Sequence, residues 1–83
     1  MASGQDTRYA QALKDFTARL RQERQKARLT QAELAERARL SVTMVQNLER
    51  PSYAGNPRLS TLLALSDALG VDPTALLPPR RRR

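Results

Sequence analysis

Residues 30–50 read TQAELAERARLSVTMVQNLER, and this stretch decides the fold. Thr30 and Glu33 have the spacing of a capping box, in which the threonine hydroxyl accepts a hydrogen bond from the Glu33 amide and the carboxylate reaches back. A capping box marks the start of a helix, and the apolar residues that follow are spaced for a helix over residues 31–38. The first half of the stretch is therefore predicted to be one short helix.

The second half of the stretch predicts another short helix. Ser41 is a candidate N-cap, and the helix that it opens runs to Glu49. Pro51 ends this helix, because a residue before proline avoids the α region. Small or apolar residues stand where the two helices must cross: Leu34, Ala35, Leu40, Val45 and Leu48. Two short helices joined by about three residues have the spacing of a helix-turn-helix pair.

The flanking residues also have helical apolar spacing, and no alternating strand pattern appears in the sequence. A first helix is predicted over residues 7–27, with Leu13, Phe16 and Leu20 on one apolar stripe. Residues 51–57 are turn formers, and we expect them to form an exposed loop.

Two more helices are predicted after this loop. One covers residues 59–69 and ends at Gly70, because glycine suits the left-handed position that closes many helices. Its apolar side is expected to hold Leu59, Leu62, Leu65 and Leu69. A short fifth helix is predicted to begin with Asp72 as N-cap and Pro73 in the first helical position.

The length of 83 residues, at 9.3 kDa, permits one domain. We expect an all-α domain, a compact bundle of five helices over residues 7–79, between a flexible N-terminus at residues 1–6 and a basic tail at residues 80–83. The sequence has neither cysteine nor histidine, which removes disulfides, the usual zinc ligands and the commonest general base near neutral pH. We therefore expect no metal, no cofactor and no enzymatic activity.

The charge of the chain favours nucleic acid as a partner. Fifteen basic and eight acidic residues give a net charge of +7 and a pI near 11.3. Residues 1–50 carry +4 and residues 80–83 carry another +4, whereas residues 51–79 carry −1, so the interaction surface is expected in the first fifty residues. No stretch has the length and apolarity of a transmembrane or secretory segment, and we expect a cytoplasmic protein with no membrane partner.

Residues 20–77 resemble the phage-repressor/Cro-type helix-turn-helix proteins, also called the xenobiotic-response-element family. The matching segments are, in order, LRQER, LTQAELAERA, LSVTMVQNLER and LSTLLALSDALGVDPTALL. The resemblance implies a lambda-repressor-like bundle with the helix-turn-helix at its second and third helices. It also implies a bacterial or phage-encoded protein, usually dimeric, that binds operator DNA, associates with the nucleoid in this way and regulates transcription.

The resemblance assigns roles to residues of the motif. Val42, Thr43, Gln46 and Asn47 match the outward positions of the recognition helix and are expected to contact bases. Glutamine and asparagine pair bidentately with adenine, threonine bonds a base edge, and valine packs on a thymine methyl. Gln31 matches a glutamine that contacts a backbone phosphate. Further candidates for phosphate contacts are Arg39, Ser41, Arg50 and Arg58.

Two other features concern the frame around the motif. Arg24 and Glu49 match an ion pair that, in this family, joins the first helix to the end of the third. Arg28 and Arg39 stand where glycine is common, so we expect either left-handed strain or a different turn path there. The loop after the third helix is longer than is common, which makes its contacts the least transferable part of the resemblance.

The leading hypothesis is a sequence-specific DNA-binding regulator, a repressor, that acts as a homodimer on a pseudo-palindromic operator. The dimer surface is expected on the fourth and fifth helices, with Leu76 and Leu77 exposed unless paired. The alternative is an antitoxin or protein-binding adaptor whose helix-turn-helix is partly structural and whose partner is a toxin or a polymerase. A charge-driven, non-specific binder of nucleic acid or anionic membranes ranks third, and an enzyme ranks last.

Overall fold

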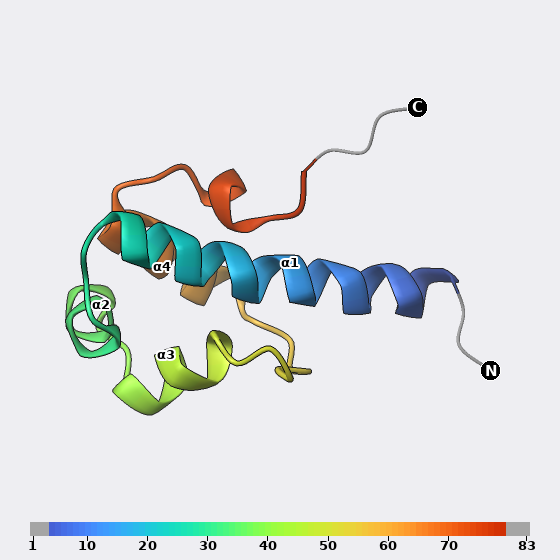
Figure 1. Ribbon diagram of the computed structural model, residues 1–83, viewed down its shortest axis with the longest axis horizontal. Helices are drawn as coiled ribbons and strands as arrows, with labels where there is room; N and C mark the ends of the chain where they lie inside the picture. Colours follow the sequence, from blue (N-terminus) through green and yellow to red (C-terminus); the bar gives the residue numbers. More distant parts are fainter. Residues whose placement is uncertain (1–3, 80–83) are drawn as a thin grey trace.

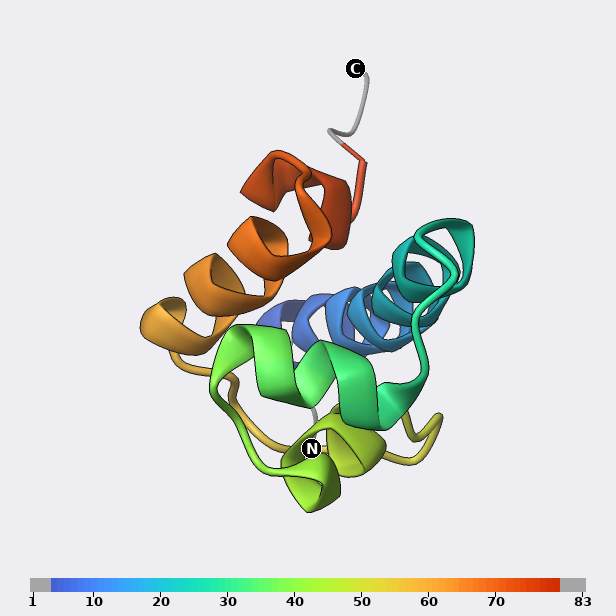
Figure 2. The ribbon, with the colours of Figure 1, turned by 90° about the vertical axis from the view of Figure 1, so that its left-hand side faces the viewer.

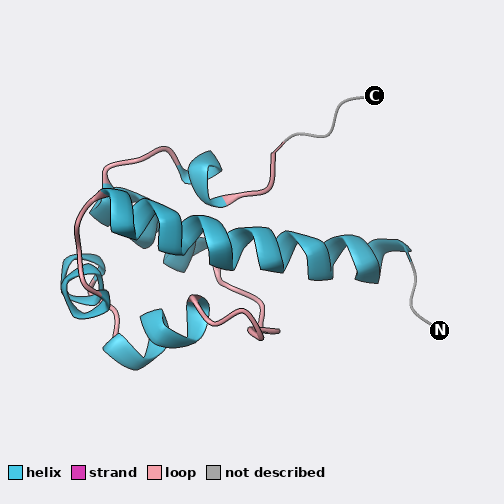
Figure 3. Cartoon of the chain, viewed as in Figure 1, coloured by secondary structure: helices cyan, strands magenta, loops and turns pink. Residues whose placement is uncertain are grey.

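The computed structural model describes residues 4–79, which form four α-helices and one short 3-10 helix without any β-strand (Figures 1 and 3). The elements are α1 (Gly4–Lys26), α2 (Gln31–Ala38), α3 (Val42–Leu48), α4 (Leu59–Leu69) and η1 (Pro73–Leu76). Helices α2 and α3 lie on one side of α1, and η1 lies on the opposite side (Figures 1 and 2). The predicted all-α class is confirmed, and residues 4–6, expected in a flexible tail, belong to α1. The predicted basic tail lies outside the described residues.

The predicted fifth helix is present only as a turn of 3-10 helix, because Pro73–Leu76 do not form an α-helix. Asp72 caps this turn as expected, and its carboxylate accepts a hydrogen bond from the Thr74 amide at 2.9 Å. Leu77 has an extended backbone (φ −104°, ψ 157°), since it precedes Pro78 and a residue before proline avoids the α region. The following proline therefore stops η1 before it can lengthen into an α-helix.

The two middle helices begin at the caps predicted from the sequence. The Thr30 hydroxyl accepts a hydrogen bond from the Glu33 amide at 3.0 Å, and the Glu33 carboxylate accepts one from the Thr30 amide at 2.8 Å. The Ser41 hydroxyl accepts a hydrogen bond from the Met44 amide at 3.0 Å. These bonds fix the first residues of α2 and α3, and so they fix the length of the turn between the two helices.

The turns on both sides of α2 place an arginine in the left-handed region. Arg28 and Arg39 each have a φ of 58°, and Gly70, which closes α4 as predicted, has a φ of 70°. A residue with a Cβ atom loses about 1 kcal/mol in this conformation, whereas glycine does not. The expected left-handed strain at the two arginines is confirmed. Both turns keep a path that glycine would adopt freely.

All five helical elements contribute to one apolar core. The apolar stripe predicted for α1 is buried, and the largest fully buried apolar side chains are Leu20, Leu34, Val45, Leu65 and Leu76. The prediction that Leu76 is exposed unless paired is wrong, because η1 packs against α1 and α4 and covers this side chain. Leu59 was expected on the inner side of α4, but it is 70% exposed. It is the first residue of α4 and lies at the edge of the apolar stripe, where no earlier turn of the helix shields it.

Two helix-capping carboxylates tie the stability of the fold to pH. Hydrogen bonds from the amide and hydroxyl of Thr30 lower the pKa of Glu33 below its ordinary value of 4.5. Hydrogen bonds from the amide and hydroxyl of Thr74 lower the pKa of Asp72 below its ordinary value of 3.8. In both cases the unfolded chain binds a proton more readily than the folded chain, so acid favours unfolding.

We expect the free energy of unfolding, measured by urea denaturation, to decrease as the pH falls from about 5 to about 3. Each capping carboxylate contributes fully to the free energy of unfolding when the pH is above its ordinary pKa in the unfolded chain. That contribution is lost as the pH falls through its lowered pKa in the folded state. Glu33→Gln and Asp72→Asn should each reduce this slope. The control Glu36→Gln, which removes an exposed carboxylate of α2 that forms no cap, should leave the slope as it is. Equal slopes for all three variants would contradict this account.

Candidate nucleic-acid interface

Helix α3 buries one face and leaves the other open. Val45 and Leu48 lie in the core, and the outward residues of the same helix are all exposed: Val42, Thr43, Gln46 and Asn47. The spacing follows the helical period, because positions one turn apart share a face. The structure therefore brings the four predicted base-contacting residues onto one accessible surface.

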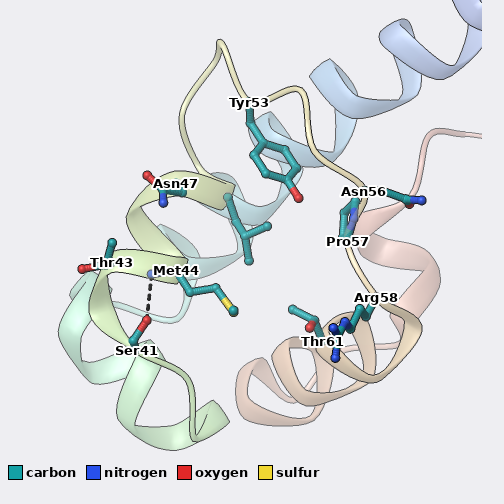
Figure 4. Close-up of a pocket in the computed structure, with 10 residues that line it drawn as sticks. Ser41, Thr43, Met44, Asn47, Tyr53, Asn56, Pro57, Arg58 and Thr61 are labelled. Atoms are coloured by element: carbon teal, nitrogen blue, oxygen red, sulfur yellow. Dashed lines mark hydrogen bonds between the residues drawn. The ribbon is translucent and has the colours of Figure 1, made fainter.

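A groove of about 420 Å³ runs beside this surface, between α3 and the segment that leads into α4 (Figure 4). Its α3 wall is formed by Ser41, Thr43, Met44, Asn47 and Leu48. Its other wall is formed by Tyr53, Asn56, Pro57, Arg58 and Thr61. Arg58, predicted to contact phosphate, thus faces α3 from across the groove. The sequence did not predict Asn56, in the loop, or Thr61, in the first turn of α4, since no local pattern tells how this segment folds back toward α3.

A second hollow, of about 380 Å³, lies where the end of α1 meets the start of α2 and the end of α3. Gln31 and Arg50, both predicted to contact phosphate, line it together with Gln46. Arg21, which the sequence analysis did not single out, lines it too. The sequence feature that could have indicated this position is that Arg21 lies one turn before Arg24 on the same face of the helix. Four cationic or amide side chains, those of Arg21, Gln31, Gln46 and Arg50, therefore line one hollow at the exposed face of α3.

The remaining predicted phosphate contact, Arg39, is exposed in the turn between α2 and α3 and lines neither hollow. Ser41 lines the first groove, and its hydroxyl already accepts the Met44 amide as the cap of α3. The oxygen of that hydroxyl is therefore used by the helix, while its proton remains able to donate to an anion.

The predicted ion pair between Arg24 and Glu49 is present and largely buried. Arg24 Nε donates to Glu49 Oε2 at 2.6 Å and Arg24 Nη2 donates to Oε1 at 2.9 Å, with side-chain exposures of 13% and 3%. Arg24 Nη1 also donates to the Leu29 carbonyl at 2.8 Å, and Gln31 Nε2 donates to Glu49 Oε1 at 3.2 Å. The hydrogen bonding that Arg24 donates to the Glu49 carboxylate raises the pKa of Arg24, against the lowering effect of burial. One carboxylate therefore joins the end of α1, the start of α2 and the end of α3.

The described residues offer no metal site and no membrane span. Within residues 4–79, no group of three His, Cys, Asp or Glu side chains is placed to hold a metal ion. None of the helices in that range is both long enough and apolar enough to cross a bilayer.

Arg24→Ala should lower the free energy of unfolding by about 3 kcal/mol, because it leaves the Glu49 carboxylate buried without its guanidinium partner. The double variant Arg24→Met/Glu49→Leu removes both charges, retains apolar volume and should lose much less. Urea denaturation at neutral pH measures both. As a control, Lys26→Ala breaks an exposed ion pair with Glu23, whose atoms are 3.4 Å apart, and should lose under about 1 kcal/mol. A similar decrease in the free energy of unfolding for the single and the double variant would contradict the view that an unpaired buried Glu49 carboxylate causes the loss.

Comparison with known proteins agrees with this geometry. A family model described as helix-turn-helix matches residues 20–76. The immunity repressor protein of Bacillus phage phi105 is 42% identical over 59 residues, which cover 71% of this chain and 40% of that protein. The chain thus spans about 40% of the length of this relative. No solved structure matches the present chain. Members of the matched family are DNA-binding regulators and not enzymes. On this evidence, the chain belongs to the helix-turn-helix family of the phage-repressor type.

Proposed function

We propose that this chain binds double-stranded DNA in a sequence-specific manner and represses transcription. The observation that carries the proposal is the exposed face of α3, with its four base-reading side chains, held in place by the buried pair of Arg24 and Glu49. The similarity to a phage immunity repressor supports repression as the outcome of binding. Such a regulator acts where the DNA is, which agrees with the cytoplasmic location expected from the sequence.

The chemistry of the α3 face supports an operator with A·T pairs at contacted positions. Gln46 and Asn47 carry amides that pair with adenine through two hydrogen bonds, and Thr43 carries a hydroxyl that bonds any base edge. Val42 is 39% exposed and offers only methyl groups, which suit the methyl of thymine. No arginine or lysine stands within α3, so little reading of guanine is expected from this helix.

The hollows on either side of α3 supply candidates for contacts with phosphates. Gln31 uses one N–H for Glu49 and keeps a second N–H that is able to donate to a phosphate oxygen. Arg50 and Arg58 flank α3 from its two hollows, and Arg21 extends the same cationic surface onto α1. We include Ser41 and Arg39 as phosphate contacts from the start of α3 and from the turn before it. These contacts fix the protein on the duplex, and the bases confer specificity.

Selection of bound duplexes from a random pool, at about 150 mM salt, tests the proposal, because this salt weakens the sequence-independent phosphate contacts. We expect one enriched sequence, bound at least about 10³-fold more tightly than random DNA. Asn47→Ala should weaken binding by about 1–3 kcal/mol and relax the preference at one base position. The control Gln11→Ala, which truncates an exposed amide of α1, should bind like the wild type. Absence of any enriched sequence would overturn the proposal.

We infer in addition that the protein acts as a homodimer on a two-fold-symmetric site. With Leu76 buried, the candidate surface shifts to exposed leucines around α4, namely Leu59 (70% exposed), Leu63 (43%) and Leu77 (40%). Leu59 and Leu63 lie one turn apart, and Asp67 is the only charged residue of α4. A two-fold axis near this surface would place the half-site centres about one turn of DNA, roughly 34 Å, apart.

Leu63→Lys places a charge in the proposed dimer surface without touching the core. We expect it to raise the dimer dissociation constant about tenfold or more, as measured by sedimentation equilibrium. Ala32→Lys adds the same charge at an exposed position of α2 and should leave the dissociation constant unchanged. A wild-type protein that stays monomeric both alone and on its selected duplex would rule out the homodimer.

A further inference from the structure

One side chain of α1 reaches the loop that forms the far wall of the groove beside α3. The Tyr9 hydroxyl donates a hydrogen bond to the Gly55 carbonyl at 2.9 Å, across 46 residues of sequence. Tyr9 lies in the first half of α1, which precedes the part of the chain that matches the family model. Figure 1 shows that this half of α1 extends beyond the other helices.

The loop has few other hydrogen bonds to hold it in place. The Tyr53 amide donates to the Arg50 carbonyl at 2.8 Å, and the next backbone hydrogen bond along the chain runs from the Leu62 amide to the Arg58 carbonyl. In the described part of the chain, the bond from Tyr9 is the one hydrogen bond that residues 54–57 make. A segment without backbone hydrogen bonds opens easily unless side chains hold it.

Packing places Gly55 between two tyrosines. The Tyr53 ring packs against the edge of the core, and a Cβ atom built on Gly55 would lie 2.6 Å from the Tyr53 hydroxyl oxygen. Any larger residue at position 55 would require the Tyr53 ring to shift. Burial, with a smaller contribution from the neighbouring Tyr9, raises the pKa of Tyr53 above its ordinary value of 10.0. The loop is therefore held by Tyr53 from the core and by Tyr9 from α1.

We propose that Tyr9 is a positioning residue for DNA binding, which holds residues 54–58 so that Arg58 faces the recognition helix across the groove. The proposal rests on the DNA-binding function proposed above. Gly55 is three residues from Arg58, and Arg58 lines the groove opposite Thr43 and Asn47 (Figure 4). A loop freed from Tyr9 must be ordered when DNA binds, and this ordering lowers the affinity.

Tyr9→Phe tests this role, because it removes the hydroxyl and keeps the ring. On the duplex selected by the wild type, we expect Kd to rise about 3- to 10-fold. The slope of log Kd against log salt should decrease by up to about one, as expected when one phosphate contact is lost. The thermal midpoint should fall by no more than about 5 °C, since only one partly exposed hydrogen bond is removed.

Double-mutant cycles separate positioning from a general loss of stability. If Tyr9 acts through the loop, adding Tyr9→Phe to Arg58→Ala should raise Kd by less than about a further twofold. Adding Tyr9→Phe to Asn47→Ala should raise Kd by the same factor as it does in the wild type. If Tyr9 had only a general structural role, Tyr9→Phe would raise Kd by the same factor in both variants. Gln11→Ala is the control: it removes an exposed side-chain hydrogen bond of α1, from Gln11 to Asp15 at 3.4 Å, at a position that does not line the groove, and Kd should stay within about twofold of the wild type.

The possible failures are distinguishable. Equal binding by wild type and Tyr9→Phe, equal multiplication in the two cycles, or an equal effect of Gln11→Ala would each overturn the role of Tyr9 while leaving DNA binding intact. If the wild type enriches no duplex at all, the proposed function fails and the role of Tyr9 fails with it.

Discussion

A buried carboxylate at the end of α3 is the point on which the geometry of the candidate interface depends. Glu49 is almost fully enclosed, and it receives two hydrogen bonds from Arg24 and one from Gln31. A charge inside a protein needs partners at fixed distances, because water is not there to replace them. Leucines pack acceptably at many relative angles, whereas this network allows one arrangement of the three helix ends. The core thus stabilises the bundle, and the ion pair orients the exposed face of α3.

Features encoded by neighbouring residues were predictable from the sequence. The caps at Thr30 and Ser41 and the stop at Gly70 depend on hydrogen bonds or backbone angles within a few residues, and the structure confirms all three. The pair of Arg24 and Glu49, 25 residues apart, was expected only from the family resemblance, and it is confirmed as well. The exposed face of α3 followed from its helical period. The DNA contacts assigned to that face remain predictions.

Features that depend on distant segments were not predictable. Leu76 was misplaced because its burial requires η1 to fold back onto α1 and α4, and spacing within a short turn does not reveal this. Leu59 was misplaced because apolar spacing does not show where the core ends along a helix. Arg21 was not predicted as part of the candidate interface, because its place there depends on the end of α1 lying beside Gln31. The bond from Tyr9 to Gly55 had no sequence signal, because a lone tyrosine and a loop glycine form no pattern.

The two walls of the groove differ in how they are built, and this affects how the protein can change over evolutionary time. One wall is α3, which is part of the folding unit, so most substitutions on its inner side disturb the core. The other wall includes Asn56 and Pro57, which belong to a loop whose residues 54–57 make no backbone-to-backbone hydrogen bonds within the described chain. Lengthening such a loop costs little, about 0.6 kcal/mol for each doubling. Insertions there would therefore reshape the groove while the bundle continues to fold, which gives the chain a route to new binding preferences that leaves its recognition helix unaltered.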